Sequence, residues 1–123
     1  MKNKNYKIGV FISDEGYGHS VRQKTLINEF LKNYPNIKFT IFNNKRLSFL
    51  KEYFGNKLDY VSYPNTLYTV KKKNGELDLK KTKKVLISWS KNSSLNIYKL
   101  LKKKKLDFNF IISDLVPEAF ELA

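Results

Sequence analysis

Cysteine is absent from the 123 residues, which excludes a disulfide framework and any cysteine-ligated zinc site. The chain also lacks an apolar run long enough to cross a bilayer. Residues 1–5 are basic, but the apolar run Ile8–Ile12 is shorter than a signal-peptide core, and no small-residue cleavage site follows it. We therefore expect a cytoplasmic protein.

Arginine is scarce although the formal net charge is +13, because Arg22 and Arg46 are the only arginines among 24 basic residues. Proteins that read nucleic-acid sequence favour arginine forks, so a nearly all-lysine surface disfavours a nucleic-acid partner. Two interpretations of the charge remain. It reflects a lysine-rich composition with a solvated surface, or it attracts the protein to an anionic membrane leaflet as a peripheral protein.

The residues that are present indicate one globular domain, with 41% hydrophobic and 15% aromatic residues. Short apolar runs alternate with segments of helical spacing. The predicted strands are Tyr6–Ile12, Ile37–Phe42, Leu58–Tyr63 and Asp107–Ser113; the predicted helices are Ser20–Asn33, Arg46–Phe54, Lys84–Lys105 and a last one opening at Pro117; residues 65–82 are predicted to be a polar excursion.

This alternation predicts an α/β fold, a Rossmann-like parallel sheet with helices on both faces. A doubly wound sheet normally carries more than four strands, so we expect residues 1–123 to be part of a larger domain. An edge of the sheet would then be exposed and would favour self-association.

Ligands of such sheets bind beyond the carboxyl ends of the strands, where the strand order reverses. If the order is 3-2-1-4, the loop after the first strand meets the loop after the fourth, and His19 can touch Asp114. A carboxylate on one ring nitrogen leaves the other free to accept a proton, which makes a general base. The alternatives are a capping or surface histidine and, for Asp114, a helix N-cap before Pro117.

Four further residues of the two loops are candidate substrate ligands. Gly16 and Gly18 allow close approach of an anion to a helix N-terminus, although Val21 stands where a dinucleotide fingerprint needs a third glycine, and a simple tight turn is the alternative. Arg22 lies one turn after His19 and can clamp a phosphate or a carboxylate; the alternative is an ion pair with Asp14 or Glu15. Glu118 can bind a sugar hydroxyl, or it is a first-turn glutamate favoured by the helix dipole.

Apolar residues of the second predicted helix, namely Leu47, Phe49, Leu50 and Tyr53, can dock a lipid acceptor, although core packing is the expected place for most of them.

Two segments resemble glycosyltransferases of the GT-B fold. Gly16-Tyr17-Gly18-His19-Ser20-Val21-Arg22 is similar to their GxGHxxR segment, and Ile111–Ala119 is similar to their ISDxxPxA segment, in the same order. The resemblance implies an acceptor-side N-terminal domain, with the C-terminal donor-binding domain absent from this chain. It implies a catalytic base at His19, support from Asp114, substrate contacts that include Tyr17, and no metal or other cofactor.

The partners implied by the resemblance are a nucleotide-sugar donor and a hydroxyl acceptor, for which a lipid-linked acceptor is one option, so the expected activity is hexosyl transfer. Two alternatives stay open: a sugar-nucleotide hydrolase or epimerase on the same scaffold, and a non-enzymatic basic module that binds nucleic acid. The fragment alone is not expected to turn over a sugar nucleotide.

Overall fold

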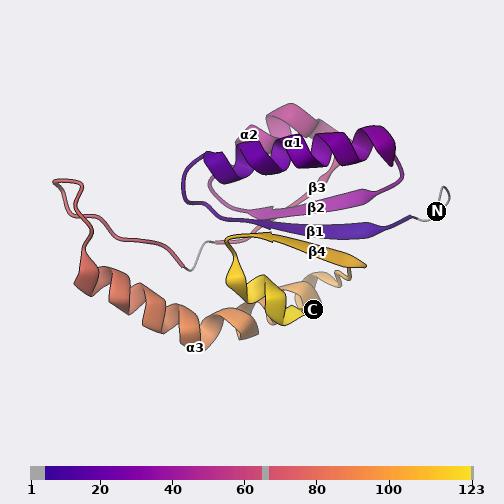
Figure 1. The fold of residues 1–123 in the computed structure, drawn as a ribbon. Helices are drawn as coiled ribbons and strands as arrows, with labels where there is room; N and C mark the ends of the chain where they lie inside the picture. Colours follow the sequence, from indigo (N-terminus) through magenta and orange to yellow (C-terminus); the bar gives the residue numbers. More distant parts are fainter. Residues whose placement is uncertain (1–4, 65–66, 123) are drawn as a thin grey trace.

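The computed structural model describes residues 5–64 and 67–122 of the chain, and strands and helices alternate along it (Figure 1). The strands are β1 (Lys7–Ile12), β2 (Lys38–Asn43), β3 (Asp59–Ser62) and β4 (Phe110–Asp114). The helices are α1 (Gly18–Asn33), α2 (Leu47–Phe54) and α3 (Leu79–Lys104), with two 3₁₀ helices, η1 (Gly55–Lys57) and η2 (Pro117–Leu122). None of the helices within the described ranges is both long enough and apolar enough to span a bilayer.

The four strands form one parallel sheet in the order β3-β2-β1-β4. This confirms the predicted α/β, Rossmann-like fold, and the order is the one on which the expected meeting of His19 and Asp114 depended. The order reverses between β1 and β4, so the chain leaves these two neighbouring strands at the same edge of the sheet. In the register of the pair, Ile12 lies opposite Asp114.

Helices cover both faces of the sheet, α1 and α2 on one side and α3 with η2 on the other (Figure 1). Because successive strand residues point to opposite faces, β1 supplies both layers. Val10 packs under α1 and α2, whereas Phe11 packs toward α3, and both are fully buried. Burial on both faces explains why the strands are apolar almost throughout.

The α3 face of the sheet contains a glycine that the packing requires. A Cβ atom built on Gly9 would lie 3.0 Å from the ring of Phe108, closer than carbon atoms normally approach. Phe108 in turn packs edge-on against Phe42, at 5.7 Å between ring centroids. Gly9 therefore makes room for an aromatic ring from the segment that precedes β4.

Several predicted boundaries differ from the observed ones. Helix α3 begins at Leu79, five residues before the predicted Lys84, because the Asp78 side chain accepts a hydrogen bond from the backbone N–H of Lys81 and caps it. The predicted polar excursion is therefore shorter; its residues 65–66 lie outside the described part of the chain. Strand β4 begins at Phe110 instead of Asp107, and the predicted last helix is a 3₁₀ helix.

Candidate functional site

The loops that follow β1 and β4 are joined directly. The backbone N–H of Ser13 donates to the carbonyl oxygen of Asp114 at 2.9 Å, which extends the β1–β4 pairing by one step. The first loop then leads into α1, whose first turn contains His19. The parallel pairing therefore places the last residue of β4 next to the start of α1.

His19 and Asp114 are in hydrogen-bond contact, as the sequence predicts. Nδ1 of His19 lies 2.8 Å from Oδ1 of Asp114, and the side chains are 16% and 5% exposed. A carboxylate carries no proton to donate, so this short distance assigns the ring proton to Nδ1. Nη2 of Arg22 also lies 3.1 Å from Nδ1, but Nδ1 cannot accept from it while it donates to the carboxylate.

Asp114 is the centre of a larger network. Arg22 donates to both carboxylate oxygens, from Nη2 to Oδ1 at 2.6 Å and from Nε to Oδ2 at 3.1 Å, and Gln23 donates from Nε2 to Oδ2 at 2.8 Å. Burial opposes the charge on this carboxylate. The hydrogen bonds from Arg22, Gln23 and His19 outweigh burial and hold the pKa of Asp114 below its ordinary value.

Two alternatives from the sequence are wrong. Arg22 pairs with Asp114 and not with Asp14 or Glu15, and this contact raises the pKa of the Arg22 guanidinium. Asp114 does not cap the following helix, because its side chain faces α1. The neighbouring Ser113 holds that turn, its Oγ accepting from the N–H of Val116 at 3.3 Å and donating to the carbonyl of Val116 at 2.7 Å.

The second ring nitrogen of His19 is available for chemistry. Among the described residues, no group forms a hydrogen bond with Nε2. With the proton on Nδ1, Nε2 carries a lone pair and can take a proton from a hydroxyl. The imidazolium formed in that step is stabilised by the Asp114 carboxylate, which is the geometry that a general base requires.

The glycine loop leaves backbone accessible in front of α1. Gly16 has a φ of +73°, which favours glycine, whereas Gly18 has ordinary backbone; a Cβ at either would meet no atom within 4 Å. Tyr17, the N-cap residue of α1, makes no side-chain capping hydrogen bond. The backbone at Gly16 and Gly18 therefore lies beside open space, where an anion can approach, whereas Ser20 in the first turn of α1 is fully buried.

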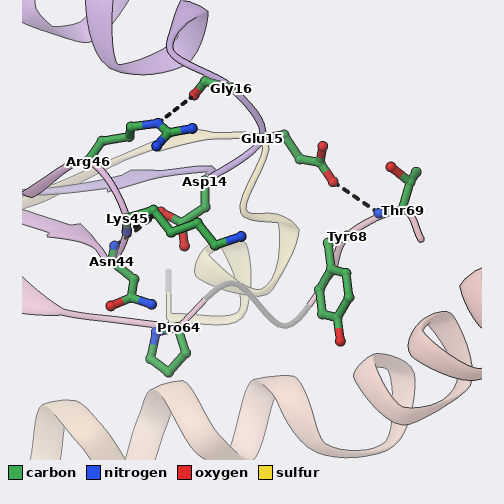
Figure 2. A pocket seen from close by; sticks show the side chains of 9 residues that line it. All are labelled: Asp14, Glu15, Gly16, Asn44, Lys45, Arg46, Pro64, Tyr68 and Thr69. Atoms are coloured by element: carbon green, nitrogen blue, oxygen red, sulfur yellow. Dashed lines mark hydrogen bonds between the residues drawn. The ribbon is translucent and has the colours of Figure 1, made fainter. Parts of the chain in front are cut away.

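A cavity of about 570 Å³ lies on the other side of the same loop, beyond β1, β2 and β3 (Figure 2). Nine residues line it: Asp14, Glu15, Gly16, Asn44, Lys45, Arg46, Pro64, Tyr68 and Thr69. His19 and Asp114 are not among them. The cavity and the His19–Asp114 pair thus flank the loop after β1 from two sides.

The residues around this cavity are tied together by the loop's own side chains (Figure 2). Oδ1 of the buried Asp14 accepts from the N–H groups of Asn44 and Lys45, at 3.2 and 2.9 Å. Arg46 stacks on Tyr17, with its guanidinium carbon 4.0 Å from the ring centroid. Tyr17, a predicted substrate ligand, also packs edge-on against Phe49 of α2, at 5.8 Å between ring centroids.

Glu118 lies in a different environment from the predicted sugar ligand. It is buried, and its two carboxylate oxygens accept from Tyr63 Oη at 2.7 Å and from Trp89 Nε1 at 2.9 Å. These bonds connect η2 to the end of β3 and to α3. Glu118 is thus engaged on the α3 side of the sheet, and its contact with a sugar hydroxyl stays a prediction.

The predicted lipid-docking residues of α2 pack mainly in the core. Leu50 is fully buried, and Leu47 and Phe49 pack against the same core cluster. Tyr53 is 48% exposed, and Lys24 lies over its ring at 4.1 Å from the centroid. Three of the four residues therefore pack in the core, and Tyr53 is the exception.

Sequence reasoning missed two polar residues of this region. Gln23 is buried and hydrogen-bonded to Asp114, and its signal is its position one turn after His19 on the same face of α1. Asp14 is 5% exposed, and nothing local distinguishes it from a solvated loop acid. Its burial depends on the loop after β2 arriving beside it.

Two buried polar atoms beside the network lack a partner. Within the described residues, neither Oγ of Ser20 nor Oε1 of Gln23 forms a hydrogen bond. Each such group costs about 1–3 kcal/mol of desolvation. Unsatisfied groups of this kind are rare in folded proteins and concentrate where a structure serves function as well as stability.

No model of a known protein family matches the sequence, and a search of curated proteins finds no significant match. Among residues 5–64 and 67–122, no three histidine or acidic side chains gather as metal ligands. Interpretation of the site therefore depends on its own geometry.

Proposed function

We propose that this chain is the acceptor-side part of a glycosyltransferase that uses a nucleotide-activated sugar, with His19 as the general base. The observation that carries the proposal is the His19–Asp114 contact of 2.8 Å, at the reversal point of a parallel sheet, together with an Nε2 that no described residue bonds. This is the position at which α/β folds of this kind bind their ligands.

In the proposed reaction, Nε2 of His19 takes the proton of the acceptor hydroxyl as its oxygen attacks the anomeric carbon of the sugar. The new carbon–oxygen bond forms while the bond from the anomeric carbon to the nucleotide diphosphate breaks, and the configuration inverts. The Asp114 carboxylate stabilises the imidazolium, and its hydrogen bond fixes the ring orientation throughout.

Gly16, Gly18 and Arg22 have the complementary role of receiving negative charge. The backbone at Gly16 and Gly18 borders open space in front of α1, and the Arg22 side chain is 62% exposed although its guanidinium contacts Asp114. An incoming phosphate or carboxylate can therefore share this guanidinium. The partner that Arg22 takes in the reaction is an acceptor carboxylate or a phosphate.

Transfer of a sugar, as opposed to another reaction that needs a base, is supported by the resemblance of two segments. The GxGHxxR-like and ISDxxPxA-like segments supply His19 and Asp114, residues 95 positions apart that make contact in the fold. Donor binding is assigned to a part of the enzyme outside this chain.

The test is to assay the polypeptide that contains this chain with a panel of nucleotide-sugars, with and without hydroxyl acceptors. Replacing His19 with Ala should lower kcat by about 10²- to 10⁴-fold, the usual contribution of a general base. The matched control is Thr25→Ala, an exposed position on the same helix, which should leave the rate unchanged. An unchanged rate in His19→Ala would remove the assigned base, and nucleotide release that is independent of acceptor would identify a hydrolase.

A further inference from the structure

Residues 67–91 form a projecting arm that consists of the segment before α3 and the first half of that helix. Figure 1 shows this part of α3 extending past the sheet, at the end where α1 begins. Among the α3 side chains that the structure describes, the buried ones are Ser93 and Ile97, which both lie in the second half of the helix. The arm is bonded to the body near its two ends, by the Thr69 N–H to Glu15 Oε1 and by Trp89 Nε1 to Glu118 Oε2. Between them it is braced locally, by the Lys71–Leu77 bridge and by the bond from the Val70 N–H to Thr82 Oγ1.

The charge of the projecting arm is strongly positive. It contains eight lysines against two acidic residues, Glu76 and Asp78, and Asp78 is occupied as the cap of α3. Helix α3 as a whole has nine lysines and no acidic residue. Within the described residues, none of the arm's lysines takes part in an ion pair. Their charge is therefore available to an external anion.

The same arm exposes large apolar side chains. Leu79, Leu86 and Ile87 are 73%, 50% and 43% exposed, and Tyr68 and Leu77 are also exposed. Leu79 and Leu86 are seven residues apart, two turns of helix, so they share one face, whereas Ile87 lies about 100° further round the helix than Leu86, next to Lys83. Trp89, which is half-buried, faces the body of the protein and donates to Glu118. The apolar stripe formed by Leu79 and Leu86 thus lies beside the face on which Trp89 contacts the body of the protein.

We infer that the projecting arm binds the surface of an anionic lipid bilayer. An interfacial helix combines an apolar stripe, which enters the headgroup region, with lysines that contact anionic headgroups. Nucleic acid would use the lysines but offers no partner for Leu79, Leu86 and Ile87, so the exposed aliphatic residues favour lipid. The inference goes beyond the proposed sugar transfer and does not depend on His19.

The experiment measures binding of the full chain to vesicles of phosphatidylcholine alone and of phosphatidylcholine with phosphatidylserine. Binding is expected to the second kind, and K80Q/K81Q/K83Q/K84Q should weaken it by roughly 5-fold for each lysine removed. Leu79→Ser with Leu86→Ser should weaken it further at constant charge. The matched control K32Q/K38Q/K51Q/K57Q removes the same charge outside the arm and should have a smaller effect.

Three outcomes would overturn the inference. The first is an equal loss of binding in the control variant, and the second is a double leucine variant that binds like the wild type. The third is tighter binding to duplex RNA than to vesicles with the leucines dispensable, which would assign a nucleic-acid surface. Circular dichroism of each variant checks folding, and His19→Ala should bind vesicles normally, which separates this result from the fate of the proposed reaction.

Discussion

Nδ1 of His19 lies 2.8 Å from Oδ1 of Asp114, although 95 positions separate the two residues in the chain. The contact determines which ring nitrogen carries the proton, because only a protonated Nδ1 can lie so close to a carboxylate. Since His19 is the one histidine, its ring nitrogens give an unambiguous signal in a ¹⁵N NMR spectrum.

We expect the neutral ring of His19 to be the Nδ1–H tautomer, because Nδ1 donates to the Asp114 carboxylate. Asp114→Asn should raise the fraction of the Nε2–H tautomer, because an amide stabilises the Nδ1 proton less than a carboxylate does. A wild-type spectrum dominated by Nε2–H would contradict the assigned geometry.

The lowered pKa of Asp114 predicts how its contribution to stability depends on pH. The folded state holds the carboxylate charged below the ordinary pKa of 3.8, so the contribution is complete above that value and is lost as pH falls through the folded pKa. Asp114→Asn should cost about 2–3 kcal/mol at neutral pH, because it places an amide N–H₂ against donors. Urea unfolding should show the gap to the wild type closing below about pH 4; a gap that is constant with pH would contradict this.

Ser20 and Gln23 are both buried in α1, but they should respond oppositely to the loss of their polar groups. Ser20→Ala removes a hydroxyl without a partner and should leave the free energy of unfolding unchanged or slightly raised. Gln23→Leu removes a donor to the Asp114 carboxylate and should lower it by about 1.5–3 kcal/mol. Equal decreases in the free energy of unfolding for the two variants, measured by chemical denaturation, would contradict this prediction.

Substitution by alanine should have opposite effects on stability at Gly9 and at Gly18. Gly9→Ala forces a methyl group against the Phe108 ring and should destabilise the protein by about 1–3 kcal/mol. Gly18→Ala meets open space in the first turn of α1 and should stabilise it by about 0.5–1 kcal/mol. Thermal unfolding of the two variants should therefore shift Tm in opposite directions.

The outer edge of β4 is expected to mediate self-association. Among the described residues, β4 pairs with β1 alone, and Phe110 at its start is 55% exposed. Phe110→Lys should lower the weight-average mass measured by light scattering at high protein concentration, because charged residues protect sheet edges. Tyr53→Lys, at a similarly exposed position on α2, is the control. A wild-type monomer at all concentrations would exclude the interface.

The alternation of apolar runs and helical spacing was sufficient to predict the fold. Burial on both faces makes the strands apolar throughout, and Pro35 and Gly55 mark helix ends locally, so these features are visible in a single sequence. The meeting of His19 with Asp114 was predictable for a related reason. In a parallel sheet, a known strand order is enough to say which loops are neighbours.

The sequence by itself thus determined the α/β class and, for a strand order of 3-2-1-4, the two loops that hold the site; the strand order itself comes from the structure. Only the tertiary structure decided which partners the charged side chains take: Arg22 turns to Asp114, Glu118 turns to Tyr63 and Trp89, and Asp14 is buried beneath the next loop. The physical reason is range. Strand and helix patterns arise from neighbours along the chain, whereas a hydrogen bond is decided within about 3 Å between residues that only folding brings together.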